Sequence, residues 1–445
     1  MKCIPTSAIL TTLLALPLLT ACEAPRYALQ DGAGGPAASG PYPPSALPQS
    51  HGVYTVANPQ TPAACRANRK KVAAELESGH LAIHSGDEVD GRFVADPHFY
   101  WLTGVNTPDL VLLLEVADGE LQNETLYVPA KDPGFERWNG TRIAPGEDAE
   151  AETGIANVDD ITGWADHLAS YATKDVRLFT FGSPLTEQAG ELGLETQSGV
   201  ATVRKAAAIR TEAELIALQA AIDITQDALV DAFGVIQPGT WEYQAEAAIE
   251  GGFRKRGAIA PGFPSIVGSG PNTCFLHYRD NMRQMQAGDL VVMDVGARFG
   301  GFTADVTRTI PVSGTFTERQ REVYQAVWDA SLAGAAELKP GSSLRQAHEA
   351  AAALLEERGL REYFFHSVGH GLGLLVHDNP SSRTELVPGM VVTIEPGVYI
   401  AAEELGVRIE NDWLITEAGA ELLSSRIPSD PDALLDFLAQ VRPQD

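Results

Sequence analysis

The stretch from Leu290 to Ile310, LVVMDVGARFGGFTADVTRTI, contains two apolar runs that each carry one aspartate. Runs of this length that are rich in Val, Ile and Thr are typical of buried strands. The first run predicts a strand over Leu290 to Val295, and the second predicts a strand over Thr303 to Ile310. Asp294 and Asp305 therefore lie where an isolated carboxylate costs several kcal/mol, unless it is protonated, paired or bound to a cation.

Two further apolar segments show the same feature. Met390 to Ile394 leads into Glu395, and Val407 to Ile415 contains Glu410. Any one of these carboxylates could be a strand-end group that backbone donors satisfy. Four that converge would also repel one another, and few arginines or lysines lie nearby in the sequence. We therefore expect two divalent cations to balance the four charges.

A histidine-rich segment, HSVGHGLGLLVHD, spans His366 to Asp378 and contains His366, His370 and His377. Its three glycines argue against a regular helix, so it is not the helical two-histidine zinc motif. We expect a loop that brings backbone close to the metals and supplies a nitrogen ligand. A lone histidine is more often structural, but together with His277 these histidines favour a site.

The ordered set of acidic and histidine residues resembles the pita-bread metallopeptidases, specifically aminopeptidase P and prolidase, from about residue 53 to 420. The resemblance implies an α/β (α+β) chain, with a creatinase/aminopeptidase P-like N-terminal α/β domain before a pita-bread catalytic domain. It also implies two metal ions, usually Mn²⁺, with Co²⁺ or Zn²⁺ as alternatives. The five positions that match the family's metal ligands are Asp294, Asp305, His370, Glu395 and Glu410.

The same resemblance implies catalytic roles. Asp305 and Glu410 would bridge the two ions. Glu395 would move a proton from the attacking water to the leaving proline nitrogen. His277 and His377 occupy positions that supply or orient donors for the oxyanion.

Three further residues match the family's substrate-binding positions. His366 and Tyr399 correspond to residues of the proline pocket. Strand alternation puts Arg408 on the same face as Glu410, near the metals. A structural salt bridge is the alternative for Arg408.

The segment DPHFYWLTG, Asp96 to Gly104, resembles part of the N-terminal domain of aminopeptidase P, which methionine aminopeptidases lack. It therefore favours an Xaa-Pro aminopeptidase that acts on peptides with proline at the second position. The alternatives are a prolidase, which cuts only Xaa-Pro dipeptides, and a peptide-binding lipoprotein without catalysis. Kinship implies a homo-oligomer, a dimer or a tetramer.

The N-terminus has the layout of an export signal, with Lys2 before an apolar run from Ala8 to Leu19. Leu19-Thr20-Ala21-Cys22 resembles a bacterial lipobox, which predicts a signal peptide over 1–21 and a lipid on Cys22. Ordinary secretory cleavage near Ala21 or Ala24 is the alternative. Glu23 favours sorting to the periplasmic side of an outer membrane.

Composition and helix signals set the remaining boundaries. Residues 22–52 are rich in Gly, Pro and Ala and predict a flexible tether, followed by domains over 53–203 and 204–445. Thr211 with Glu214, Thr317 with Gln320 and Ser343 with Gln346 each predict a capped helix start.

The chain carries 59 acidic and 32 basic residues, a formal charge of −27 that disfavours nucleic acid as a partner. After removal of a signal peptide the remaining cysteines are Cys65 and Cys274. Because they are far apart in sequence and lack a metal-binding spacing, we expect unpaired buried thiols.

Overall fold

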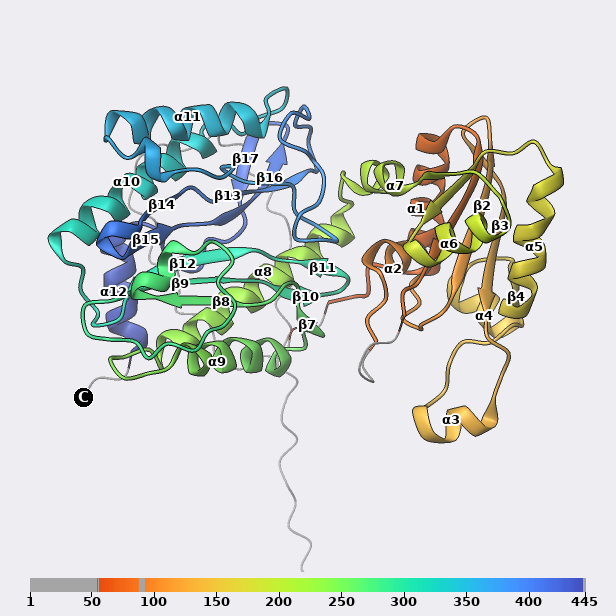
Figure 1. The fold of residues 1–445 in the computed structure, drawn as a ribbon, viewed down its shortest axis with the longest axis horizontal. Coiled ribbons are helices and arrows are strands. Elements are labelled where there is room, and N and C mark those ends of the chain that lie inside the picture. The colour runs from red at the N-terminus through yellow and green to blue at the C-terminus, as the bar shows by residue number, and fades with distance from the viewer. Residues whose placement is uncertain (1–53, 55, 88–92, 443–445) are drawn as a thin grey trace, which may run out of the picture. The chain divides into compact units, whose positions relative to one another are not determined.

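The computed structural model describes residues 54, 56–87 and 93–442 (Figure 1). The predicted signal peptide, Cys22 and the predicted tether over 22–52 lie outside these residues. No helix among the described residues is long and apolar enough to cross a bilayer. The helices and strands of the described residues fall into an N-terminal and a C-terminal half.

The N-terminal half contains one six-stranded mixed sheet in the order β4-β3-β2-β1-β5-β6. β2 pairs antiparallel with β1 and β3, whereas the remaining neighbours pair parallel. The apolar run at the start of β2 is buried, as a central strand requires. The strands are β1 (Gly79–His84), β2 (Val111–Ala117), β3 (Glu120–Val128), β4 (Asn157–Asp160), β5 (Leu178–Phe181) and β6 (Thr196–Ser198).

Seven α-helices accompany this sheet within the described residues, and side chains cap the start of α1, α2 and α3. The motif that begins at Asp96 forms α2, because the Asp96 carboxylate accepts hydrogen bonds from the backbone N–H groups of His98 and Phe99. α2 ends at Gly104, whose φ of 74° suits glycine. The helices are α1 (Pro62–Leu76), α2 (Pro97–Thr103), α3 (Pro133–Asn139), α4 (Glu147–Thr153), α5 (Trp164–Ser170), α6 (Ser183–Glu191) and α7 (Val200–Ala207). The predicted domain boundary between 203 and 204 falls within α7 and stays a prediction.

The C-terminal half contains small antiparallel sheets, among them β12-β9-β8 and β13-β16-β17. The strand predicted over Leu290 to Val295 is β9, and the one predicted from Met390 is β13. The two longer predicted strands are each broken in two near their carboxylate. The strands are β7 (Ala260–Pro261), β8 (Ile266–Ser269), β9 (Leu290–Val295), β10 (Ala297–Phe299), β11 (Phe302–Thr303), β12 (Val306–Pro311), β13 (Val391–Ile394), β14 (Gly397–Ile400), β15 (Leu405–Arg408), β16 (Asn411–Thr416) and β17 (Gly419–Leu422).

Five helices accompany these sheets, and two of the three predicted capping boxes form. Thr211 with Glu214 opens α8, and Thr317 with Gln320 opens α10. The box predicted at Ser343 is wrong, because the Ser343 hydroxyl donates to the side-chain oxygen of Gln346 and accepts no backbone N–H. The helices are α8 (Glu212–Phe233), α9 (Glu242–Lys255), α10 (Glu318–Ala335), α11 (Leu344–Glu357) and α12 (Pro431–Val441).

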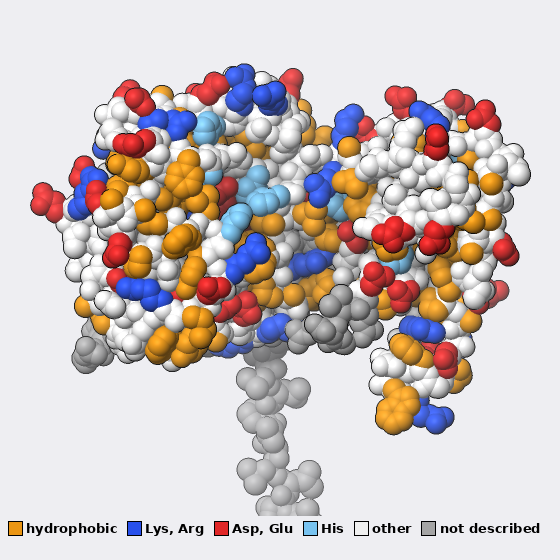
Figure 2. All heavy atoms as spheres, in the orientation of Figure 1, with side chains coloured by type: hydrophobic (Ala, Val, Ile, Leu, Met, Phe, Trp, Pro, Cys, Tyr) orange, Lys and Arg blue, Asp and Glu red, His pale blue; other side chains and the backbone are white. Residues whose placement is uncertain are grey.

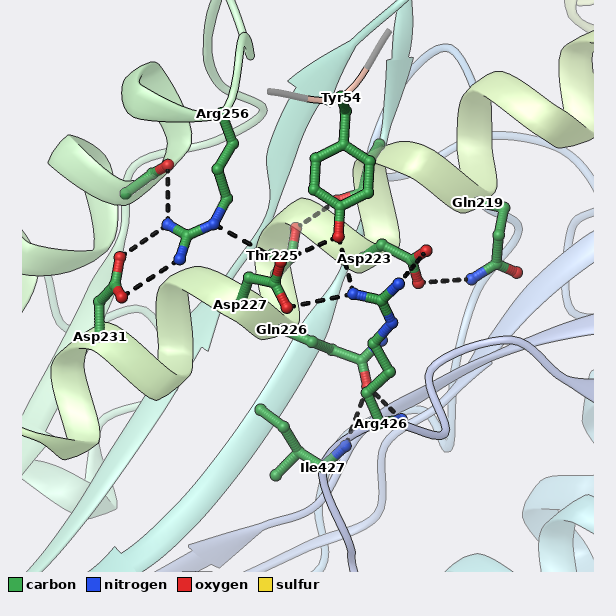
Figure 3. Close-up of polar contacts among 12 residues, drawn as sticks. Tyr54, Gln219, Asp223, Thr225, Gln226, Asp227, Asp231, Arg256, Arg426 and Ile427 are labelled. Carbon is green, nitrogen blue, oxygen red and sulfur yellow. Dashed lines mark hydrogen bonds and ion pairs between the residues drawn. The ribbon is translucent and has the colours of Figure 1, made fainter. Parts of the chain in front are cut away.

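A polar network holds α8 to the segment after β17 (Figure 3). The guanidinium of Arg426 lies between two buried aspartates of α8, 2.9 Å from Asp223 Oδ2 and 3.1 Å from Asp227 Oδ1. Tyr54 joins the network, because its hydroxyl donates to Asp227 Oδ2 at 2.8 Å. These charges are paired, which makes their burial on a core helix affordable.

The two cysteines agree with the prediction in part. Cys65 and Cys274 are both free thiols, and Cys65 is buried. Cys274 is only partly buried.

Candidate active site

The two broken strands place carboxylates at the end of their hydrogen-bond ladders. Asp305 lies between β11 and β12, and its N–H donates to Asp412 Oδ2 at 3.4 Å. Glu410 lies between β15 and β16, and its N–H donates to the carbonyl of Thr307 at 3.1 Å. Because both residues leave the regular ladder here, their side chains meet although they are more than a hundred positions apart.

His370 lies against three of the predicted ligands. Its Nε2 is 3.4 Å from Asp305 Oδ2, 3.5 Å from Glu395 Oε1 and 3.8 Å from Glu410 Oε1. Donor atoms of Asp305, His370 and Glu410 all lie within 4.8 Å of one another. The structure therefore brings together four of the five residues through direct contacts to one imidazole.

The hydrogen bond of His370 determines which of its ring nitrogens carries the proton. Its Nδ1 lies 3.1 Å from the carbonyl of Gly371, which can only accept, so Nδ1 carries the proton. Burial, and next the neighbouring His377, lower the pKa of His370 to about 4, so the ring is neutral at pH 7. The Nε2 lone pair then faces side-chain oxygens of Asp305, Glu395 and Glu410. These acceptor atoms together suit a bound cation.

Three of the carboxylates each keep one oxygen without a hydrogen-bond donor among the described residues. These buried atoms are Asp294 Oδ1, Asp305 Oδ1 and Glu410 Oε1. Burial, followed by repulsion from Asp294, raises the pKa of Glu410 to about 8. Burial and the Glu410 charge likewise raise the pKa values of Asp305 and Glu395. Carboxylate oxygens together with one imidazole nitrogen are donors that divalent metal ions bind, so these residues fit a metal site.

Asp294 reaches the cluster from β9 and has a cationic partner. Its Oδ2 accepts a hydrogen bond from Arg408 Nη2 at 2.6 Å, and the Arg408 side chain is only 3% exposed. The salt bridge considered for Arg408 is therefore present, and it joins a predicted ligand. Few arginines or lysines lie near these carboxylates in the sequence, and the one that pairs with Asp294 comes from a strand far along the chain.

The predicted substrate-binding residues form one hydrogen-bonded chain. Arg408 Nη1 donates to the Tyr399 hydroxyl at 3.0 Å, and this hydroxyl donates to His366 Nε2 at 3.1 Å. His366 Nδ1 donates to the carbonyl of Ser367 at 2.7 Å. Burial, and next the Arg408 charge, lower the pKa of His366 to about 4. These hydrogen bonds fix the three side chains relative to one another.

The remaining predicted histidines lie beside the cluster. The rings of His370 and His377 pack edge to face, with centroids 4.4 Å apart. His277 is exposed. The pKa of His377 is lowered first by the burial of His377 and next by electrostatic interaction with His277. Histidine side chains gather on the catalytic half in the space-filling view, with acidic and hydrophobic side chains around them (Figure 2).

The glycines of the histidine loop have a packing role. The predicted loop is confirmed, since residues 366–378 form no helix. A Cβ at Gly369 would lie 2.0 Å from the carbonyl oxygen of Thr393, and one at Gly371 would lie 2.2 Å from the carbonyl carbon of Asn379. Only glycine permits these approaches.

Two residues at the site escaped the sequence analysis. Asp412 is fully buried, and burial followed by the Glu410 charge raises its pKa well above the usual range. Its position two residues after Glu410 was the available signal. Phe365 is 62% exposed, and its ring centroid lies 5.5 Å from that of Tyr399. The sequence signal was its position directly before His366, which indicated a second aromatic ring beside Tyr399.

Two family models match the chain. Residues 217–417 match metallopeptidase family M24, and residues 63–179 match the aminopeptidase P N-terminal domain. A curated Xaa-Pro aminopeptidase from Haemophilus influenzae is 31% identical, over 78% of this chain and 89% of that protein. Xaa-Pro aminopeptidase 1 from Streptomyces coelicolor is 33% identical, over 82% of this chain and 84% of that protein.

Solved structures are similar in the same way. Zinc-substituted aminopeptidase P from E. coli, in complex with product, has a TM-score of 0.77 and 26% identity, over 86% of this chain and 99% of that chain. Proline aminopeptidase P II from Yersinia pestis has a TM-score of 0.78 and 26% identity, over 85% of this chain and 100% of that chain. These matches confirm the predicted α/β fold class, with an aminopeptidase P-like domain before a pita-bread domain.

Proposed function

Because the chain belongs to the aminopeptidase P family of metallopeptidases and is a metal-dependent aminopeptidase, we propose that it is an Xaa-Pro aminopeptidase. It releases the first residue of peptides whose second residue is proline. The observation that carries the proposal is the neutral Nε2 of His370, which faces oxygens of Asp305, Glu395 and Glu410 within 3.8 Å.

The proposed ligands would hold two divalent cations, and Mn²⁺ is the first candidate. They are Asp294, Asp305, His370, Glu395 and Glu410. When bound, such a pair supplies a reactive water at neutral pH and polarises the scissile carbonyl. All five side chains come from strand ends or the histidine loop, which restricts their movement.

The chain's own groups then handle the proton and the developing charge. Glu395 accepts a proton from the attacking water and passes it to the nitrogen of the leaving proline. His377 packs edge to face on His370, with the two ring planes at 85°. We propose that His377 and His277 supply or orient donors for the oxyanion.

The proline ring is proposed to bind beside the chain of Arg408, Tyr399 and His366. The His366 ring is neutral, because burial keeps its pKa at about 4, so it offers a weakly polar surface. Phe365 adds an exposed aromatic face next to Tyr399. Aromatic-lined grooves recognise proline in other proteins, because the ring is rigid and apolar.

Peptide length and metal dependence test the proposal. Metal-free protein is reloaded separately with Mn²⁺, Co²⁺ or Zn²⁺ and assayed on Xaa-Pro and Xaa-Pro-Xaa substrates. Cleavage of tripeptides before proline is expected. Cleavage of dipeptides alone assigns the protein as a prolidase, and binding without hydrolysis assigns it as a peptide-binding protein.

We also propose that the protein is exported, acylated on Cys22 and held at the periplasmic side of an outer membrane by residues 22–52. Mass spectrometry of the mature N-terminus is expected to find a lipid on Cys22, and Cys22→Ser is expected to leave the membrane fraction. An unmodified N-terminus near Ala24 would indicate ordinary secretion instead. Light scattering tests the proposed dimer or tetramer.

A further inference from the structure

A buried arginine stands behind the histidine loop. Arg210 lies between α7 and α8, and its side chain is 0% exposed. Its Nη2 donates to Asp378 Oδ2 at 3.0 Å and to the carbonyl of Leu372 at 3.3 Å. Its Nη1 donates to the carbonyl of Ala207. One guanidinium therefore connects the start of the catalytic half to both ends of the loop segment 372–378.

Asp378 closes that segment into a tight unit. Its Oδ2 also accepts from the N–H of Leu374 at 3.1 Å, and its own N–H donates to the carbonyl of Gly371 at 2.8 Å. A Cβ at Gly373 would lie 1.7 Å from Arg210 Nη2, so the guanidinium occupies the space of a loop side chain. His377 directly precedes Asp378 and takes its position from this unit.

His370 has a separate support. Its N–H donates to Thr393 Oγ1 at 3.2 Å, and its carbonyl accepts from the N–H of Thr393 at 2.9 Å. These bonds attach His370 to β13. The two histidines thus lie on separately anchored stretches: His370 is bonded to β13, and His377 directly precedes Asp378, which pairs with Arg210.

We propose that Arg210 is a positioning residue for His377, acting through Asp378 and the loop 371–378. The proposal rests on the proposed function, in which His377 serves the oxyanion. Arginine is required, because its planar fork reaches Asp378, Leu372 and Ala207 at once, whereas lysine offers a single ammonium. Within the described residues, the polar contacts of Arg210 go to Ala207, Leu372 and Asp378, none of which is a proposed ligand or a residue of the proline pocket.

Steady-state kinetics on an Xaa-Pro-Xaa peptide provides the first test. Arg210→Met is expected to lower kcat by about 10²-fold through misplacement of His377, with KM little changed. Arg210→Lys keeps the positive charge, so we expect a smaller decrease in kcat than in Arg210→Met. In a His377→Ala background, Arg210→Met is expected to cause no further loss of kcat, because its effect passes through the missing ring. Equal losses in both backgrounds would refute the positioning role.

Arg256→Met is the matched control. Arg256 is also buried and donates to Asp231 Oδ2 at 2.6 Å, but it contacts α8 and α9 and not the histidine loop. Thermal unfolding should show a loss of stability in both variants, while kcat falls only in Arg210→Met. A matching fall in Arg256→Met would indicate that lost stability alone explains the result.

Two measurements do not depend on turnover. Calorimetric titration with Mn²⁺ is expected to give the same affinity for Arg210→Met and the wild type, because β13 holds His370. The NMR signal of the His377 ring, identified by its absence in His377→Ala, is expected to shift in Arg210→Met and to remain in place in Arg256→Met. An unchanged His377 signal would overturn the inference, even in a protein that cleaves no prolyl peptide.

Discussion

Tyr399 is the residue through which Arg408 and His366 share one hydroxyl. Tyr399→Phe removes both hydrogen bonds and leaves Arg408 Nη1 without this acceptor. We expect a loss of roughly 1–3 kcal/mol in unfolding free energy. We also expect a higher KM for Xaa-Pro-Xaa peptides, because His366 loses its fixed orientation.

Tyr324→Phe provides the control for this loss. The Tyr324 hydroxyl is also buried and donates to the carbonyl of Ser429 at 3.2 Å, away from the site. Urea unfolding should show a lower unfolding free energy in both variants, whereas KM should rise only for Tyr399→Phe. An unchanged KM in Tyr399→Phe would exclude the hydroxyl from substrate binding.

Glu395 carries the proposed proton transfer. Glu395→Gln keeps the size of the side chain but cannot accept the proton, so we expect kcat to fall by about 10²-fold or more. Circular dichroism should show an intact fold. Glu421→Gln, an exposed change on β17, is the control and should retain full turnover. Retained turnover in Glu395→Gln would remove the residue from the mechanism.

At the scale of secondary-structure elements, Glu242 joins the first turn of α9 to the loops on either side of Tyr278. The carboxylate is fully buried and accepts from the Ser269 N–H at 2.7 Å, the Tyr278 hydroxyl at 2.9 Å and the Arg283 N–H at 2.8 Å. It also accepts from the Asn272 amide. A helix start thereby fixes the loop that carries His277.

Glu242→Gln replaces one acceptor oxygen by a donor, so two of these N–H or O–H groups lose their partner. We expect a loss of roughly 1–3 kcal/mol in unfolding free energy, and a lower kcat because the His277 loop loosens. Glu250→Gln on the same helix is the control, since within the described residues Glu250 accepts one hydrogen bond, from the Ser265 hydroxyl at 3.0 Å. Equal stability of the two variants would contradict the prediction.

A second cluster of titratable groups lies on the face of the N-terminal sheet that α5 covers. His80 Nδ1 lies 2.9 Å from the Tyr171 hydroxyl, and the same hydroxyl lies 3.1 Å from His167 Nε2. Tyr127 also contacts His167. Glu115 Oε1 is 3.8 Å from His80 and 3.7 Å from His167. Strands β1, β2 and β3 all contribute to this cluster.

Burial lowers the pKa of His80 and of His167, and this outweighs the opposite effect of Glu115, while Lys174 lowers both further. The Asp159 charge opposes the shift at His167. As pH falls below the ordinary value of 6.5, the unfolded chain therefore takes up protons before the folded chain does, and stability decreases. We expect urea unfolding free energy to fall less between pH 6.5 and about pH 5 in a His80→Gln, His167→Gln double variant. An equal fall of unfolding free energy with pH in the wild type and the double variant would contradict this prediction.

For the whole molecule, the proposed metal ions link binding to stability. Ions that bind only the folded chain stabilise it by about 2.7 kcal/mol at a free concentration one hundred times Kd. We therefore expect Mn²⁺ to raise the unfolding midpoint of chelator-treated protein. Asp305→Asn should abolish this rise, whereas Asp436→Asn, an exposed change on α12, should preserve it. A rise of equal size in Asp305→Asn would argue against the proposed ligand set.

Local patterns predicted much of this architecture. The capping boxes at Thr211 and Thr317, the strand from Leu290 and the loop around His370 all depend on side chains within a few positions of one another. Such signals act through backbone propensity and short-range hydrogen bonds, which the sequence states directly. The four acidic candidates were also recognisable, because a carboxylate within or at the end of an apolar run needs a partner or a cation. The choice of His370 came from the family resemblance.

Only the tertiary structure decided how those residues meet. Arg408 pairs with Asp294 across 114 positions, and Arg210 pairs with Asp378 across 168. The strands predicted through Asp305 and Glu410 break there, because their backbone groups bond to Asp412 and Thr307 of other strands. Local sequence patterns were sufficient for most helix starts and strands and for the acidic candidate ligands, because these signals are short-range. The packing of distant strands decided partners and geometry, because such contacts depend on the whole chain and not on neighbouring residues.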